Sequence, residues 1–131
     1  MICADTSSLV ALLGGEPGRD VDLVRQALRD RILCVSPISV TELLSDPDPA
    51  PSLEEFVTQI PQLEMTPGYW ERAGKLRASM FRHQARPKVA DTLIAQSCLD
   101  HDVPLVSRDR DFASFQKFAG LRVLAIGDLP Q

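Results

Sequence analysis

Two aspartates follow apolar runs of the sequence, at positions where a parallel sheet would bring them together. Asp5 directly follows Ile2-Cys3-Ala4, and Asp109 follows Leu105-Val106-Ser107-Arg108. In open parallel sheets, ligands bind beyond the carboxyl ends of the strands. Each aspartate also precedes a predicted helix, so capping of a backbone N–H is an alternative role for either side chain.

Asp91 is the third carboxylate of this set. It projects onto the middle of an apolar arc on a predicted helix that turns about 100° per residue. That arc consists of Ile94, Ala95, Cys98 and Leu99. A carboxylate directed at a protein core is costly unless it is paired or bound to a metal. Stabilisation of the first helical turn, which Pro87 places nearby, is the alternative, and we favour the functional role.

Convergence of Asp5, Asp91 and Asp109 would define the chemistry of the site. Like charges held close together raise one another's pKa and oppose folding. A hard divalent cation removes this conflict, and Mg²⁺ and Mn²⁺ prefer carboxylate and water ligands. Because such ions activate water and stabilise charge on phosphate, the set favours metal-assisted phosphoryl chemistry.

Other reaction types lack their residues. We find no serine–histidine or cysteine–histidine pair, and Gly14-Gly15 lacks the lysine spacing of a phosphate-binding loop. His83 and His101 are too isolated for a zinc site. Cysteines 3, 34 and 98 stand among apolar neighbours, which predicts buried free thiols, a reducing compartment and a cytoplasmic location.

Two further acidic residues depend on their context. Glu42 points away from the apolar side of its predicted helix, so the pattern alone predicts a solvent-exposed side chain. Asp111 lies close enough to Asp109 to join a site there.

Short apolar runs alternate with helical patterns along the chain. The expected strands are Ile2 to Ala4, Ile32 to Val35, Leu105 to Val106 and Val123 to Ile126, with Leu63 to Met65 as a further candidate. The expected helices are Ser7 to Leu13, Arg19 to Arg29, Pro37 to Leu44, Leu53 to Ile60, Pro67 to His83, Val89 to His101 and Phe112 to Phe118. This alternation predicts an α/β fold in a single domain, residues 1–131.

Three helix starts carry specific signals. Ser36-Pro37 and Thr66-Pro67 each place a capping residue before a first-turn proline, and Ser52 to Glu55 has the spacing of a capping box. The composition, 44% hydrophobic with 24% charged residues, excludes a disordered chain. No apolar run approaches the roughly 18 residues of a membrane-spanning helix, so we expect no membrane association.

The charges are unevenly distributed. The net charge of −4 argues against a simple nucleic-acid binder, which is usually basic overall. However, the stretch from Arg72 to Lys88 carries six basic residues and no acidic one, and the rest of the chain carries eight basic and eighteen acidic residues. An acidic protein with one basic stretch is therefore the feature to explain.

The basic residues Arg72, Lys75 and Arg82 share one face of the predicted helix from Pro67 to His83. A solvated helix face, contact with RNA phosphates and a docking site for an acidic partner all remain open. Tyr69 and Trp70 could stack on bases, but their helix position favours core packing.

Four motifs resemble those of PIN-domain ribonucleases, in the order that this family shows. The first is Ile2-Cys3-Ala4-Asp5-Thr6-Ser7-Ser8-Leu9, and the second is Ser39-Val40-Thr41-Glu42-Leu43. The third is Val89-Ala90-Asp91-Thr92-Leu93-Ile94-Ala95, and the fourth is Leu105-Val106-Ser107-Arg108-Asp109-Arg110-Asp111-Phe112. Together they span nearly the whole chain, whose length matches VapC-type toxins of toxin–antitoxin pairs.

The resemblance implies a three-layer α/β/α fold with a mainly parallel sheet and Mg²⁺- or Mn²⁺-dependent endoribonuclease activity. It also implies an antitoxin partner that blocks the site, and a homodimer. Separately, we expect Phe56, Val57 and Phe81 to be exposed apolar residues that could serve a dimer or an antitoxin contact. Carried over by position, the acidic quartet is Asp5, Glu42, Asp91 and Asp109, so that Glu42 faces the site. Asp5, Asp91 and Asp109 would hold a metal, and Glu42 would orient water or help to hold a second ion. Ser7 would form hydrogen bonds beside the metal, and we favour Asp109 over Asp111 as the fourth acid because it is nearer the strand end.

Two other functions compete with this one. A non-catalytic regulatory module would bind a partner through the acidic pocket, but a phospho-accepting receiver would want a lysine where Ser107-Arg108 stands. A metal-dependent phosphatase would act on small phosphoesters instead of RNA.

Overall fold

A parallel sheet in the order β2-β1-β3-β4 organises the chain, in a computed structural model that describes residues 1–126. Within these residues the strands are β1 (Ile2–Ala4), β2 (Leu33–Cys34), β3 (Leu105–Val106) and β4 (Val123–Leu124). The central strand β1 pairs with both β2 and β3, so that Cys3 lies between Cys34 and Leu105. The predicted parallel α/β sheet is therefore confirmed.

The strands are two or three residues long, and both faces of the sheet are covered. Successive side chains of a strand point to opposite faces. Cys3 belongs to the core layer that contains Met80, whereas Ala4 belongs to the layer that contains Leu9. These continuous apolar runs thus fill two separate core layers, as expected for strands buried on both sides.

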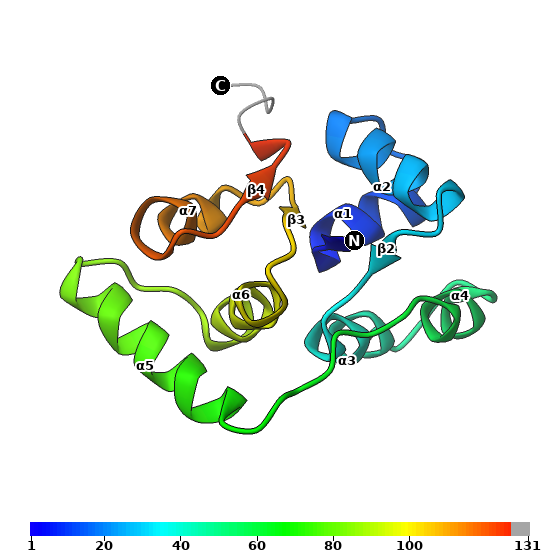
Figure 1. Ribbon diagram of the computed structural model, residues 1–131. Helices are drawn as coiled ribbons and strands as arrows, with labels where there is room; N and C mark the ends of the chain where they lie inside the picture. Colours follow the sequence, from blue (N-terminus) through cyan, green and yellow to red (C-terminus); the bar gives the residue numbers. More distant parts are fainter. Residues whose placement is uncertain (127–131) are drawn as a thin grey trace.

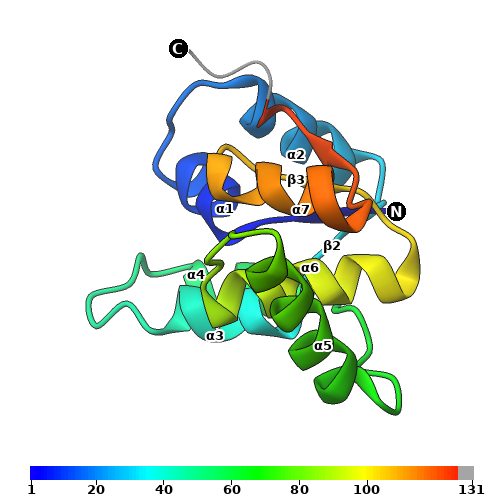
Figure 2. The same ribbon diagram turned by 90° about the vertical axis from the view of Figure 1, so that its left-hand side faces the viewer.

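Helices cover both faces of the sheet (Figures 1 and 2). On one side lie α1 (Thr6–Leu13), α2 (Arg19–Arg29), α3 (Pro37–Leu44) and α4 (Leu53–Gln59). On the other lie α5 (Tyr69–Arg82), α6 (Val89–His101), the short 3-10 helix η1 (Arg110–Phe112) and α7 (Ala113–Ala119). This arrangement confirms the three-layer architecture.

Some predicted boundaries differ from those in the structure. Val35 forms only an isolated parallel bridge with Gln62, so the candidate strand from Leu63 to Met65 is wrong. The Ser36 hydroxyl caps α3 as expected and accepts from the Ile38 amide at 3.3 Å. Ser52 lies at the start of α4, but its side chain forms no capping bond.

The start of α5 is the clearest correction. This helix begins at Tyr69 rather than Pro67, because Gly68 adopts a left-handed conformation (φ 84°) that ends the preceding turn. A Cβ at Gly68 would also lie 2.7 Å from Nη1 of Arg72. The Arg72 guanidinium instead donates to the carbonyl of Pro67 and the hydroxyl of Thr66, both at 2.8 Å. Thr66 and Pro67 therefore form a turn bound by α5 rather than its first turn.

Burial tests several other expectations. Cys3, Cys34 and Cys98 are free and buried, as predicted. Tyr69 is buried, but Trp70 is 59% exposed, so the core role predicted for Trp70 is wrong. Of the three apolar residues expected at the surface, Phe81 is exposed and Phe56 is half-buried, but Val57 is buried in the core, so the exposure expected for Val57 is wrong.

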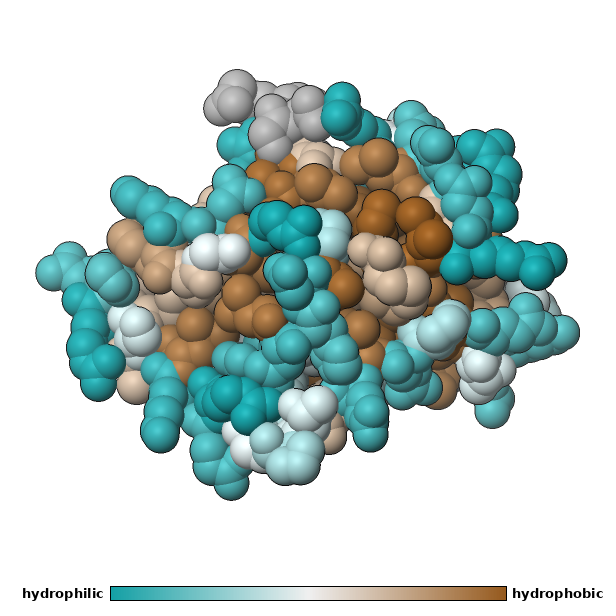
Figure 3. Space-filling view, viewed as in Figure 1, coloured by the Kyte–Doolittle hydropathy of each residue, from teal (hydrophilic) through white to brown (hydrophobic). Residues whose placement is uncertain are grey.

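The surface combines apolar and hydrophilic side chains. Seen from the side of Figure 1, brown apolar areas are separated by teal hydrophilic side chains (Figure 3). Among residues 1–126, no helix is both long enough and apolar enough to cross a membrane.

Candidate metal centre

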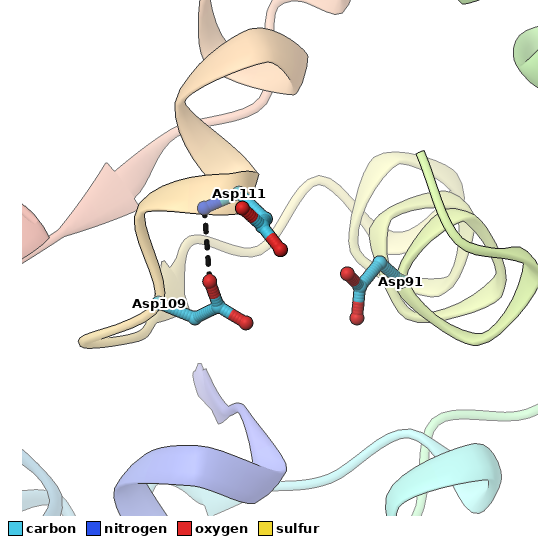
Figure 4. Close-up of side chains that lie close together, drawn as sticks. All are labelled: Asp91, Asp109 and Asp111. Carbon is cyan, nitrogen blue, oxygen red and sulfur yellow. Dashed lines mark hydrogen bonds between the residues drawn. The ribbon is translucent and has the colours of Figure 1, made fainter. Parts of the chain in front are cut away.

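Three carboxylates converge beyond the carboxyl end of β3 (Figure 4). One oxygen from each of Asp91, Asp109 and Asp111 lies within 4.8 Å of the other two. Asp91 comes from the first turn of α6, and Asp109 and Asp111 lie at the start of η1. In the part of the chain that the structure describes, no other three acidic, histidine or cysteine side chains lie so close together.

Asp109 performs the two roles that the sequence left open. One oxygen, Oδ1, accepts the backbone N–H of Asp111 at 2.9 Å and so caps η1. Its second oxygen points toward Asp91 (Figure 4). The cap fixes the carboxylate and leaves one oxygen available to a ligand.

Asp5 lies at the end of β1 and is buried. Its Oδ2 accepts hydrogen bonds from the hydroxyl of Ser7 at 2.6 Å and from that of Ser107 at 2.9 Å. Burial raises the pKa of Asp5, although these hydrogen bonds act in the opposite direction. Ser7 thus lies beside the acid that the resemblance assigns to it.

The electrostatics of Asp91 shows how closely the acids are grouped. Burial raises its pKa from 3.8 to about 6, and the negative charges of Asp5 and Asp109 contribute to the increase. Lys88 opposes this increase. Asp5 therefore acts electrostatically on the cluster, although its oxygens are not among the three that lie within 4.8 Å.

Glu42 is connected to this region through Thr6. The Thr6 hydroxyl donates to Oε1 of Glu42 at 2.7 Å and lies 3.0 Å from the Ser39 hydroxyl. Glu42 is exposed on α3, as its helical pattern predicts, and is outside the group of three. Because Thr6 directly follows Asp5, the contact nevertheless holds Glu42 at the same end of the sheet.

The donor set fits a hard divalent cation. All three converging groups are carboxylates, without the imidazole or thiolate ligands that softer metals prefer. Burial is the main cause of the raised pKa of Asp91, and the negative charges of Asp5, Asp109 and Asp111 add to it, against the single opposing charge of Lys88. A divalent ion would compensate these negative charges.

The sequence model of the PIN domain matches residues 2–118. The chain belongs to the PIN domain family. PIN domains are generally nucleases that use divalent metals, in agreement with the acidic cluster of this PIN domain. No curated protein sequence matches the chain.

Solved structures share the fold of this PIN domain. A chain of DNA-bound VapBC from Salmonella typhimurium has 20% identity and a TM-score of 0.74, with 93% of this chain and 95% of that chain covered. A chain of VapBC2 from Rickettsia felis, bound to a promoter DNA fragment, has 17% identity and a TM-score of 0.72, with 94% of this chain and 97% of that chain covered. A chain of FitAcB from Neisseria gonorrhoeae has 19% identity and a TM-score of 0.70, with 98% of this chain and 100% of that chain covered. At these identities the likeness establishes the fold alone.

The basic face of α5 in this PIN domain is partly engaged within the protein. Arg72 donates to both carboxylate oxygens of Asp100, at 3.0 and 2.6 Å, and so joins α5 to α6. This pairing holds the pKa of Asp100 below its ordinary value. Lys75 and Arg82 are exposed on the same helix.

Two residues of this region were not singled out as site residues by the sequence. Ser107 connects Asp5 to Asp109, since its hydroxyl donates to Asp5 and accepts the Asp109 amide, each at 2.9 Å. Thr6 holds Glu42. The available signal was their position directly after a strand or after its aspartate, where a short hydroxyl side chain can orient a carboxylate.

Proposed function

We propose that this PIN domain is a metal-dependent endoribonuclease and the toxin of a VapC-type toxin–antitoxin pair. The observation that carries the proposal is the convergence of Asp91, Asp109 and Asp111 in a member of a nuclease family. Asp5, whose charge helps to raise the pKa of Asp91, completes the acidic set.

Mg²⁺ or Mn²⁺ is the proposed cofactor, because all the converging donors are carboxylates. Asp91 and Asp109 would hold the ion, with Asp111 or Asp5 as a further ligand. The bound ion would supply Lewis-acid stabilisation of the phosphate and lower the pKa of water.

The chain's own residues position this chemistry. Ser7 and Ser107 fix Oδ2 of Asp5 through hydrogen bonds, and the cap at η1 fixes Asp109. Thr6 holds Glu42, for which we propose the orientation of the attacking water or a share in a second ion site. These groups would set the direction of attack on an RNA phosphodiester.

The RNA backbone needs cationic contacts outside the acidic cluster. Arg72, Lys75 and Arg82 on α5 are the first candidates for phosphate contacts. Because Asp100 pairs with Arg72, the exposed Lys75 and Arg82 are the stronger candidates of the three.

An antitoxin partner is proposed because the structural neighbours belong to VapBC and FitAcB complexes. Val10, Leu13 and Leu44 are exposed apolar residues on α1 and α3 and offer contacts for such a partner. A homodimer is proposed as well, for which the exposed Phe81 offers an apolar contact.

The remaining proposals concern location and domain organisation. Three free buried cysteines are compatible with the reducing cytoplasm. The parallel sheet that runs from β1 to β4 supports a single domain over residues 1–131, of which residues 127–131 lie outside the described part of the chain.

Purified protein incubated with total RNA tests the proposal directly. Cleavage should require Mg²⁺ or Mn²⁺, stop with a chelator and disappear in the Asp91→Asn variant. The Asp102→Asn variant is a matched control, because Asp102 is exposed at the opposite end of α6. Turnover of phosphate monoesters without RNA cleavage would indicate a phosphatase, and binding without turnover would indicate a regulatory module.

A further inference from the structure

A hollow of about 350 Å³ opens directly beside the acidic cluster. Asp91 and Asp111 belong both to the cluster and to the wall of this hollow. The rest of the wall includes the segment between α5 and α6 and the start of α7. In Figure 2 the segment between α5 and α6 lies below the start of α7. Whatever occupies the hollow is therefore adjacent to an ion held by the cluster.

Three cationic side chains line the hollow: Arg86, Lys88 and Arg110. With Asp91 and Asp111 ionised, the wall carries a formal charge near +1. A divalent ion at the cluster would offset the two carboxylates, so that Arg86 and Lys88 could attract an anion. The hollow is thus suited to a negatively charged group next to the ion, but not to a second metal.

The segment before α6 is held in place by contacts with α5 and with its own helix. Nε of Arg77 donates to the Pro87 carbonyl at 3.0 Å. The guanidinium groups of Arg77 and Arg86 lie 4.8 and 5.1 Å from the ring centroid of Phe81. The Lys88 carbonyl accepts the Thr92 hydroxyl at 2.9 Å. The backbone that carries Arg86 and Lys88 is therefore held in place, which lowers the conformational entropy lost when these residues bind a ligand.

We propose that, in the ribonuclease proposed above, this hollow binds the RNA backbone phosphate next to the one that is cleaved, through Arg86 and Lys88. Its volume lies at the small end of the range for ligand pockets, about 300–1,000 Å³, which fits one phosphate with its sugar. A single-stranded backbone supplies consecutive phosphates, so one can lie at the cluster and its neighbour in the hollow. The basic stretch then divides by role, with Arg72 bound to Asp100, Arg77 holding Pro87, and Arg86 and Lys88 facing substrate.

Binding of a labelled single-stranded RNA to the full chain, in Ca²⁺ and again in chelator, tests this assignment at several salt concentrations. Lys88→Gln and Arg86→Gln should each weaken binding about threefold or more and reduce the slope of log K against log salt by about 0.7. Lys117→Gln on α7 and Arg29→Gln on α2 make the same charge changes elsewhere and should leave both quantities unchanged.

A neutral methylphosphonate placed at successive positions of the RNA locates the contact. The wild-type protein should lose affinity when the phosphate next to the cleavage position is neutral, whereas Lys88→Gln should show no further loss there. Unchanged affinity and slope in both variants would overturn the assignment, as would losses confined to Lys75→Gln and Arg82→Gln. If the wild-type protein binds RNA through the hollow but never cleaves it, the proposed function fails and the phosphate site stands.

Discussion

The hydroxyl of Ser107 donates a hydrogen bond to Oδ2 of Asp5 at 2.9 Å, between residues 102 positions apart in the sequence. The same oxygen of Ser107 accepts the backbone N–H of Asp109, also at 2.9 Å. The backbone pairing of β1 and β3 sets the spacing of the two strand ends, and the Ser107 hydroxyl links the Asp5 carboxylate at one end to the Asp109 backbone at the other. Residues that form hydrogen bonds to metal ligands orient those ligands, and their replacement typically lowers metal affinity or activity by about 10–100-fold.

Replacing Ser107 by alanine should lower RNA cleavage by about 10–100-fold, because Asp5 loses a fixed orientation and the Asp109 amide loses its acceptor. Ser107→Thr keeps the hydroxyl and should retain more activity than Ser107→Ala. Initial cleavage rates over a range of Mg²⁺ concentrations provide the measurement.

Ser45→Ala is a suitable control for that experiment. Ser45 also donates through its hydroxyl, to the Thr41 carbonyl at 2.6 Å, but it lies at the exposed end of α3. Its removal should leave cleavage unchanged. Equal rates for Ser107→Ala and the wild-type protein would show that Ser107 does not orient the acids.

Asp91 should make the metal-free protein less stable as the pH rises. Its pKa is 3.8 ordinarily and about 6 in the folded protein, so between these values the folded state binds more protons than the unfolded state. The free energy of unfolding therefore falls as pH rises through this window, and the penalty is complete above about pH 6. Asp91→Asn should raise stability by about 1–2 kcal/mol at pH 7.5 in chelator.

Thermal unfolding of both proteins from pH 4 to pH 8 measures this effect. The advantage of Asp91→Asn should shrink toward pH 4, where Asp91 of the wild-type protein is protonated. Asp100→Asn should behave in the opposite way, because Arg72 lowers the pKa of Asp100 and the pair stabilises the fold at neutral pH. An Asp91→Asn advantage that does not depend on pH would refute the electrostatic explanation.

Patterns of apolar residues predicted the fold well. Continuous apolar runs identified β1 and β3 to the residue, since strands buried on both faces leave no polar position. The start of α5 was missed because the left-handed conformation of Gly68 outweighs the Thr66-Pro67 signal. Trp70 was misassigned because it directly follows the buried Tyr69, and a one-residue step rotates a helical side chain by about 100°.

The site was less accessible to sequence patterns than the fold. The positions of Asp5 and Asp109 directly after predicted strands indicated these two acids. The hydrogen bond from Ser107 to Asp5 joins residues that are far apart in the sequence, so no local pattern predicts it. Glu42 is exposed, as its own helix pattern predicts, and only the resemblance connected it to the acids. The ion pair between Arg72 and Asp100 could not be predicted either, because the two residues lie on different helices and no local pattern relates them.

Metal binding should depend on three acids more than on Glu42. In the wild-type protein, Mg²⁺ at 100 times its dissociation constant should add about 2.7 kcal/mol of stability. Asp91→Asn, Asp109→Asn and Asp111→Asn should each reduce the Mg²⁺-induced shift in melting temperature, because they supply the converging oxygens. Glu42→Gln should reduce it less.

Asparagine is the informative substitution at position 109. It retains a side-chain oxygen that can cap the Asp111 amide, so a loss of the Mg²⁺ shift would reflect the missing charge and not an unfolded η1. Asp109→Ala should lose the cap as well and melt lower than Asp109→Asn without metal. A full Mg²⁺ shift in Asp109→Asn but not in Asp111→Asn would make Asp111 the principal acid of this segment.

The ion pair between Asp20 and Arg108 should show a strong asymmetry on mutation. Asp20 is fully buried, and its oxygens accept from Arg108 at 2.8 and 3.1 Å and from Ser8 at 2.8 Å. Arg108 is 27% exposed at its side chain. Arg108→Met should therefore cost about 3–5 kcal/mol by leaving a buried charge, whereas Asp20→Ala leaves a cation that water can reach and should cost less.

Denaturant unfolding of the single variants and of Asp20→Asn combined with Arg108→Met tests this asymmetry. Burial raises the pKa of Asp20, but the hydrogen bonds from Arg108 and Ser8 outweigh it, so this pKa is low in the wild-type protein. Without Arg108 it should rise, and Arg108→Met should regain stability relative to the wild-type protein as the pH falls toward 4. The double variant, which has no buried charge at position 20, should be more stable than Arg108→Met at pH 7. A double variant as unstable as Arg108→Met would show that lost packing, and not the unpaired carboxylate, causes the destabilisation.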